Sequence, residues 1–322
     1  MQNRKVKGII LVAVGIVAMW FTFSPINLFP SAFSFDTENI HVERSVEADA
    51  FKNIVIHTRS TDVNVVRSDS EQINVLLQGS ASDNAADKLD LNIEPKGDTL
   101  ELGLNVPGGF LISFNRSNVD LTVELPEKQW NKVVVRTGSG DIDLKKIEGA
   151  SLEIEAGSGD VQASQIKGEV LVVNTGSGDI NITEFEVNKA NIMVGSGNIT
   201  GSDFISQELK FTAGSGDVKL ANGQSQLIGE TGSGNVRIES DDLLYDADLH
   251  AGSGDITVNL SNQPQSLALD YSGSSGEGRI EWDGIAYDEN SEDRDRIRGS
   301  FGSGNVQLKV RTSSGDFTLG KG

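Results

Sequence analysis

The chain has 322 residues, with 36 glycines, 6 prolines, no cysteine and a formal net charge of −20. Without cysteine there are no disulfides and no thiolate metal sites, and the negative charge argues against a nucleic-acid partner, which requires a basic surface. Only 6% of the residues are aromatic, and with abundant glycine this favours many short strands and tight turns over a large mixed core.

The first segment has the pattern of a membrane anchor. Residues 1–7 are basic without an acid, and Gly8–Phe23 is uncharged and mostly apolar. As a helix this run would extend about 24 Å against a hydrocarbon core of about 30 Å, and apolar residues up to Phe29 lengthen it. We predict a cytoplasmic stub over 1–7 and a transmembrane signal-anchor over 8–29, giving a single-pass cell-membrane protein with its bulk extracytoplasmic.

A cleaved signal peptide is the alternative for this segment. It would share the basic start and apolar middle, but its cleavage site requires small residues in an A-x-A-like pattern. Ser24–Ala32 (SPINLFPSA) fits that pattern poorly. The sequence favours an uncleaved anchor and leaves cleavage open.

Residues 30–45 are predicted to be a tether, and residues 46–135 an irregular, strand-rich part of the fold. The loop SASDNAADK interrupts this part, and Pro126 ends its last strand. Since the repeats that follow need a covered end, we expect 46–135 to cap them. The predicted strands are Ile54–Ile56, Val63–Val65, Ile73–Leu76, Leu100–Leu104 and Leu121–Leu125.

From residue 136 a Gly-Ser-Gly-Asp/Asn tetrad recurs at a nearly fixed interval. Successive starts from Gly138 to Gly252 differ by 19, 19, 19, 19, 18 and 20 residues, and Arg59–Asp62 is an earlier relative. A fixed period near 20 residues is typical of a solenoid. The tetrads begin at Gly138, Gly157, Gly176, Gly195, Gly214, Gly232, Gly252 and Gly302, with degenerate copies at 273–276 and 313–316.

Apolar residues keep constant positions relative to the tetrads. Polar residues alternate with them, which predicts short strands with one face inward. We therefore predict an all-β fold: a parallel β-solenoid (β-helix) of single handedness, with coils of about 19 residues, behind one N-terminal transmembrane helix. The regular part covers 136–322. The first apolar column is Ile142, Val161, Ile180, Ile199, Val218, Val236 and Ile256.

The tetrad fits a corner between strands. Glycine permits positive φ and close stacking, and the following Asp or Asn oxygen can accept a backbone N–H in an Asx-type turn. A stacked calcium ladder is the alternative, but asparagine interrupts the acids, so we expect no metal and no cofactor. The predicted turn-capping residues are Asp141, Asp160, Asp179, Asn198, Asp217, Asn235, Asp255, Asn305 and Asp316.

Residues 277–300 are an acidic insertion, interpreted as a solvated loop. Asp283, Asp288 and Glu292 are its candidate contact residues. Asp288, Asn290 and Glu292 have a loose calcium-loop spacing but lack the glycine expected after them, which leaves calcium binding there open.

The sequence provides no catalytic constellation. Its three histidines are scattered, and it has neither a G-x-S-x-G nucleophile elbow nor a P-loop. We predict no catalytic residue and no enzymatic activity. Because parallel β-helices include carbohydrate-active enzymes, such an enzyme remains the alternative.

The Leu121–Pro126 strand (LTVELP) leading into repeated T-G-S-G-D-I coils resembles the bacterial putative-adhesin β-solenoid family, of largely unknown function, over residues 50–320. The resemblance implies a surface-exposed coiled β-structure, often behind a membrane segment and sometimes linked to envelope stress, without established catalytic residues. We expect a non-enzymatic adhesin or envelope scaffold that binds a cell-wall polymer, a cationic peptide or a membrane protein. An envelope-stress sensor or accessory protein acting through a membrane partner is the other alternative.

Overall fold

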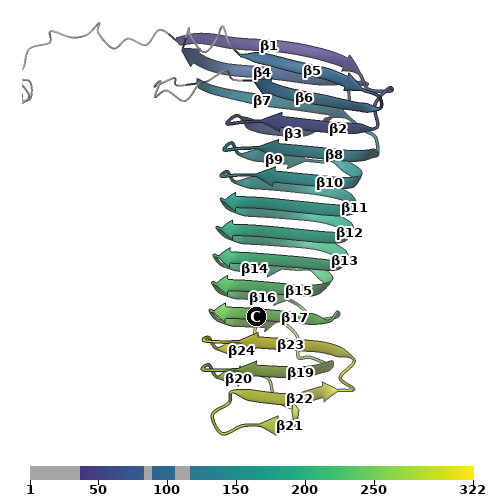
Figure 1. Cartoon of the computed structure of the whole chain (residues 1–322). Helices are drawn as coiled ribbons and strands as arrows, with labels where there is room; N and C mark the ends of the chain where they lie inside the picture. Colours follow the sequence, from purple (N-terminus) through teal and green to yellow (C-terminus); the bar gives the residue numbers. More distant parts are fainter. Residues whose placement is uncertain (1–36, 83–88, 106–116) are drawn as a thin grey trace, which may run out of the picture. The chain divides into compact units, whose positions relative to one another are not determined.

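The computed structural model describes residues 37–82, 89–105 and 117–322, and Glu38–Gly322 form one compact unit. This part of the chain is built from 24 strands and their turns (Figure 1). The predicted stub and transmembrane segment, residues 1–29, lie outside the described residues. Within the described ranges, no helix has the length and apolarity needed to cross a membrane.

The centre of the unit is a stack of parallel coils (Figure 1). Equivalent residues of neighbouring coils pair in register, as Val161, Ile180 and Ile199 do. The all-β fold of parallel repeats is thus confirmed. The strands of this part are β8 (Trp130–Thr137), β9 (Ile142–Lys145), β10 (Glu148–Ala156), β11 (Val161–Ser177), β12 (Ile180–Ser196), β13 (Ile199–Ser215), β14 (Val218–Ala221), β15 (Gln224–Ser233), β16 (Val236–Ser240), β17 (Ala247–Ser253) and β18 (Ile256–Leu260).

The core consists of apolar columns that run from coil to coil. The column from Ile142 to Ile256 is at most 1% exposed at every coil. In another column Phe185 and Phe204 stack with ring centroids 5.1 Å apart. Glycine at 223 leaves room for the Phe204 ring, because an added Cβ there would overlap it. Such complementary sizes let stacked coils bury large side chains at close packing.

The first coil along the chain is formed by β2 and β3, but other strands lie beyond it at the N-terminal end of the stack. Strand β2 pairs in parallel with β6 and β8, and β3 pairs with β7 and β9. Antiparallel pairs, β4 with β7 and β5 with β6, follow beyond this coil. The bounds are β1 (Thr37–Glu47), β2 (Asn53–Thr58), β3 (Asp62–Ser68), β4 (Gln72–Ser82), β5 (Asp90–Lys96), β6 (Thr99–Asn105) and β7 (Ser117–Pro126).

The predicted tether, residues 30–45, overlaps strand β1 and is wrong for that part. Residues 37–45 were expected to connect the anchor to the fold, but they belong to β1, which pairs with β4. Alternating residues such as Ile40 and Val42 pack against the core, so the sheet recruits this segment. The rest of the predicted tether lies outside the described residues.

The C-terminal strands are also out of chain order. Strand β23 lies between β17 and β19, and β24 lies between β18 and β20, so the last coil is inserted inside the stack. Strand β22 then pairs antiparallel with β19 and β21 at the end of the stack. The bounds are β19 (Ser266–Gly273), β20 (Gly278–Ile280), β21 (Ala286–Asn290), β22 (Arg296–Gly302), β23 (Val306–Thr312) and β24 (Phe317–Lys321).

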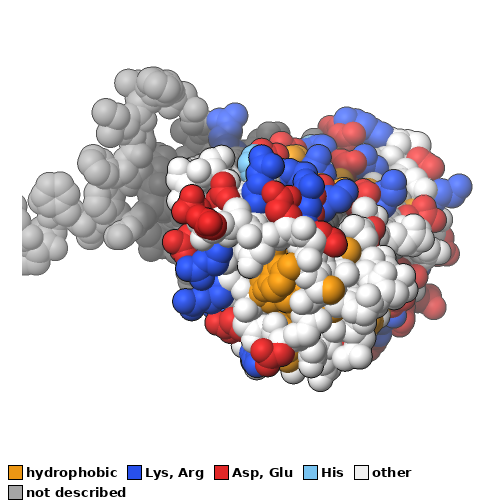
Figure 2. Space-filling model, turned by 90° about the horizontal axis from the view of Figure 1, so that it is seen from below, with side chains coloured by type: hydrophobic (Ala, Val, Ile, Leu, Met, Phe, Trp, Pro, Cys, Tyr) orange, Lys and Arg blue, Asp and Glu red, His pale blue; other side chains and the backbone are white. Residues whose placement is uncertain are grey.

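The acidic insertion 277–300 is therefore not a loop, as predicted, but contributes β20, β21 and most of β22. Ile280, Trp282 and Ile285 from this segment pack against the core. Figure 2, viewed from this end, shows apolar side chains grouped near the middle, with acidic and basic side chains toward the rim. Strand β22 of this segment pairs with β19 and so covers the C-terminal end of the stack. The many acids of the segment made this structural role hard to detect from sequence.

Candidate functional site

The Asp and Asn residues of the tetrads form a ladder along one corner of the stack. Asp141 Oδ1 accepts the backbone N–H of Asp160 at 2.9 Å, and Asp160 Oδ1 accepts that of Asp179 at 2.8 Å. The bond thus joins successive coils, whereas the sequence predicted a bond inside each turn. The same bond continues through Asn198, Asp217, Asn235, Asp255 and Asp316.

The ladder begins earlier than the exact tetrads and excludes one of them. Asp62 Oδ1 accepts the N–H of Asp141 at 2.8 Å, so the degenerate tetrad at 59–62 occupies the same corner. Asn305 is not part of the ladder, and its turn-capping role stays a prediction. Its tetrad forms the turn between β22 and β23, and its N–H donates to Ser266 Oγ at 2.8 Å instead.

The glycines of the tetrads are required by close approach between coils. A Cβ added at Gly176 would lie 2.5 Å from the carbonyl oxygen of Gly157, and one at Gly195 would lie 2.5 Å from that of Gly176. These separations are far inside van der Waals contact. The predicted crowding of stacked corners is therefore confirmed, and it explains why glycine returns at the same corner.

The ladder faces an open hollow of about 790 Å³, lined also by Lys219 and Arg237. Asn198 and Asn235 separate acids of the ladder, and each supplies the same bridging oxygen as its acidic neighbours. In the described ranges, no three His, Cys, Asp or Glu side chains are grouped so that they could hold a metal ion.

A second corner, present in five successive coils, was missed by the sequence analysis. Five stacked residues there have positive φ although none is glycine, with values from 53° to 60°. All are polar and stand eight residues after the first glycine of a tetrad, which is the signal that could have identified them. They are Lys146, Gln165, Glu184, Asp203 and Asn222.

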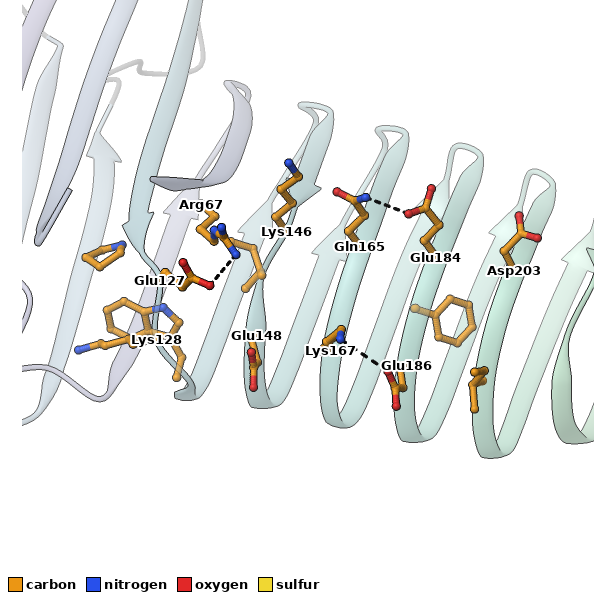
Figure 3. Close-up of a pocket in the computed structure, with 15 residues that line it drawn as sticks. Arg67, Glu127, Lys128, Lys146, Glu148, Gln165, Lys167, Glu184, Glu186 and Asp203 are labelled. Carbon is orange, nitrogen blue, oxygen red and sulfur yellow. Dashed lines mark hydrogen bonds and ion pairs between the residues drawn. The ribbon is translucent and has the colours of Figure 1, made fainter. Parts of the chain in front are cut away.

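Beyond this second corner the coils present a face with two hollows, which we call the side face. The hollows measure about 460 and 510 Å³ and share the lining residues Glu148, Lys167, Glu186 and Ile205. Figure 3 shows the first hollow between two rows of side chains, one containing Gln165 and Glu184, the other Lys167 and Glu186. Gln165 donates to Glu184 at 2.9 Å, and Lys167 lies 3.7 Å from Glu186.

The N-terminal end of the first hollow is closed by internally satisfied charges. Arg67 pairs with Glu127 at 2.8 Å. Lys128 Nζ lies 4.0 Å from the centroid of the buried Trp130 ring and donates to the backbone oxygens of Ala48 and Phe51 at 2.8 and 2.7 Å. Burial lowers the pKa of Lys128. These groups hold the fold together rather than offering free charge to a ligand.

The predicted contact residues lie elsewhere. Asp283, Asp288 and Glu292 are exposed in the segment at the C-terminal end and line neither hollow of the side face. Asp288 lies where the pairing of β21 with β22 shifts register. The structure thus separates the acids that the sequence singled out from the hollows that the coils form.

The repeated corners and parallel register define the class of protein, a β-solenoid of stacked coils. The chain belongs to the Toastrack DUF4097 family, whose model matches residues 51–242 and 195–320. The resemblance to putative adhesins drawn from the sequence is confirmed. None of the curated proteins compared with the chain matches it.

Several solved structures are similar to this chain, and the first named here, with a TM-score above 0.5, shares its fold. A putative adhesin from Parabacteroides distasonis is 14% identical, with a TM-score of 0.51, over 88% of this chain and 98% of that one. A putative adhesin from Parabacteroides merdae is 15% identical, with a TM-score of 0.48, over 87% and 96%. A putative lipid binding protein from Parabacteroides distasonis is 15% identical, with a TM-score of 0.45, over 89% and 98%.

Proposed function

We propose that this chain is a non-enzymatic binding or scaffold module of the cell envelope. The side face is the observation that carries the proposal. Its rows of polar side chains repeat from coil to coil, at the roughly 4.8 Å spacing of paired strands. Solenoids use such extended surfaces to bind partners, and the Parabacteroides distasonis relative with this fold is named as a putative adhesin.

The proposed location is outside the cell membrane, with residues 8–29 as the anchor. The basic residues before this run support that orientation, because lysine and arginine stay on the cytoplasmic side. The absence of cysteine makes a clean test available. In the full chain, Asn188→Cys should react with a membrane-impermeant maleimide on intact cells, whereas Gln2→Cys should react only after lysis. The reverse pattern would contradict this location.

Binding is tested with residues 38–322, which form one compact unit. We expect saturable binding to purified cell-wall polymer, to a cationic peptide or to a membrane protein captured from intact membranes. A lack of saturable binding in all three assays would contradict a binding module.

A further inference from the structure

The C-terminal part of the side face exposes large apolar side chains. Ile205 is 50% exposed and lines both hollows, and Tyr245 is 44% exposed and lines the second hollow. The adjacent Leu244 is 63% exposed. Grouped apolar side chains on an otherwise polar surface are typical of an interaction site.

The same surface carries excess negative charge. Apart from the closed end at Arg67, Glu127 and Lys128, the two hollows are lined by five acids and two lysines. Within the described ranges, one ion pair joins these charges, between Lys167 and Glu186 at 3.7 Å. The acids are Glu148, Glu169, Glu184, Glu186 and Asp203.

These two properties select the chemistry of the occupant. An anionic lipid headgroup or an anionic wall polymer would be repelled by the acids, and a neutral sugar would leave them without a partner. A basic peptide satisfies the acids, and its apolar side chains cover Ile205 and Tyr245. Since the acids lie in rows along successive coils, an extended segment can contact several of them at once.

We propose that the side face binds a peptide segment of a partner protein in which basic and apolar residues alternate. This inference rests on the proposed binding function and names its ligand class. Lysine or arginine side chains lie against Glu184, Glu186 and Asp203, while leucine-like side chains cover Ile205 and Tyr245.

The test measures fluorescence anisotropy of labelled twelve-residue peptides with residues 38–322. The probes alternate lysine with leucine, glutamate with leucine, or lysine with serine. We expect the lysine–leucine peptide to bind about tenfold more tightly than either of the others, with affinity that falls as salt is added.

Two variants locate the site. The triple variant Glu184→Gln, Glu186→Gln, Asp203→Asn should weaken binding of the lysine–leucine peptide about tenfold, since each exposed charge contributes a fraction of a kcal/mol. Ile205→Ser with Tyr245→Ser should weaken it by a similar factor while leaving the salt dependence unchanged.

Matched controls remove the same chemistry from other surfaces. The variant Asp143→Asn, Glu230→Gln, Glu43→Gln has the same net charge as the triple variant, and Met193→Ser removes an apolar side chain that is 39% exposed on β12. Both should bind within about twofold of the unmodified chain. Equal losses in controls and side-face variants, or equal binding of the glutamate–leucine peptide, would overturn the inference. If the unmodified chain and the side-face variants bind wall polymer alike but do not distinguish the peptides, the proposed binding function holds and the inference about the peptide ligand is wrong.

Discussion

In the ladder, one side-chain oxygen of each coil accepts a backbone N–H of the next coil at the corner. Asp179 illustrates the bond, because its Oδ1 accepts both the backbone N–H of Asn198 at 2.8 Å and the amide of that side chain at 3.1 Å. The backbone donor would otherwise be left without a protein acceptor at a crowded corner. An amide oxygen can replace the carboxylate, as Asn198 itself does for Asp217.

Asp179→Ala should therefore lower the free energy of unfolding by about 1–2 kcal/mol, the cost of losing this hydrogen bond. Asp179→Asn should stay within about 0.5 kcal/mol, because it retains the oxygen. Urea denaturation of residues 38–322 followed by circular dichroism measures both. If the Asn variant were as unstable as the Ala variant, the charge and not the oxygen would be required.

The stacking of the coils also requires glycine at the first position of the tetrad. Gly176→Ala places a Cβ 2.5 Å from a carbonyl oxygen of the adjacent coil, so the two coils must separate, at a cost of about 1–3 kcal/mol. Gly103→Ala is the matched control, since its Cβ would meet nothing within 4 Å. The measurement is the shift of the urea midpoint, and equal shifts for both variants would contradict the crowding argument.

Asp120 gives the stability a pH dependence at the N-terminal end. It pairs in register with Asp62 on the adjacent coil, and burial, followed by the charge of Asp62, raises its pKa. A raised carboxyl pKa means that stability is lost as pH rises from the ordinary Asp range through the folded pKa. Asp120→Asn should therefore stabilise the chain by about 0.5 kcal/mol at pH 7 and not at pH 3. Parallel melts at the two pH values test this, and equal gains at both would contradict it.

At the scale of elements, the ends of the stack are built in a different order from its centre. Strands β23 and β24 lie between coils that precede them in the chain. Their removal leaves a gap inside the stack rather than a shorter stack. The antiparallel strands β19, β22 and β21 then lose their connection to the rest of the core.

Truncation after Asn305 should accordingly abolish hydrogen-exchange protection over residues 266–302. A contrasting variant is Asp288→Pro, in the outer strand β21, which pairs with β22 within the described ranges. Proline on an edge strand removes little, so its effect should stay within β21. Protection of 266–302 in the truncated chain would show that the last coil is dispensable.

The coils could be predicted from the sequence because the residues that form them recur at a regular interval. The interval between tetrads and the alternation around residues such as Val161 directly specify which residues stack and which face inward. The order of coils at the ends could not be predicted, since β2 and β23 have the same alternation as any other strand. Their neighbours are chosen by long-range pairing, which local patterns do not encode.

The side face was missed for a related reason. Its positive-φ corner uses residues such as Gln165 and Asp203 in place of glycine, so the sequence lacks the glycine or proline that most clearly marks a turn. The remaining signal is the constant position of a polar residue relative to the tetrads, which is much weaker. Its apolar residues, Ile205 and Tyr245, come from different coils and become neighbours only through stacking. The acids near Asp288 are closer together along the chain, and the contact residues were therefore predicted there instead.

At the scale of the whole molecule, each coil contacts mainly its two neighbours, so stability should be nearly a sum over coils. Deleting residues 180–198 removes one full period and joins Asp179 to Ile199. Every column then stays in register, because Ile199 takes the place of Ile180 against Val161. The chain should fold, with stability reduced by roughly 1–2 kcal/mol and a melting temperature lower by a few degrees.

Deleting residues 180–189 is the informative contrast. This deletion removes about half a period, so downstream residues meet the wrong columns and apolar side chains are forced outward. It should prevent cooperative folding, although it removes less of the chain. Circular dichroism and thermal melts of residues 38–322 compare the two deletions. Because the coils are units of one register, the longer deletion must be the milder one, and the opposite ranking would show that contacts beyond neighbouring coils hold this stack together.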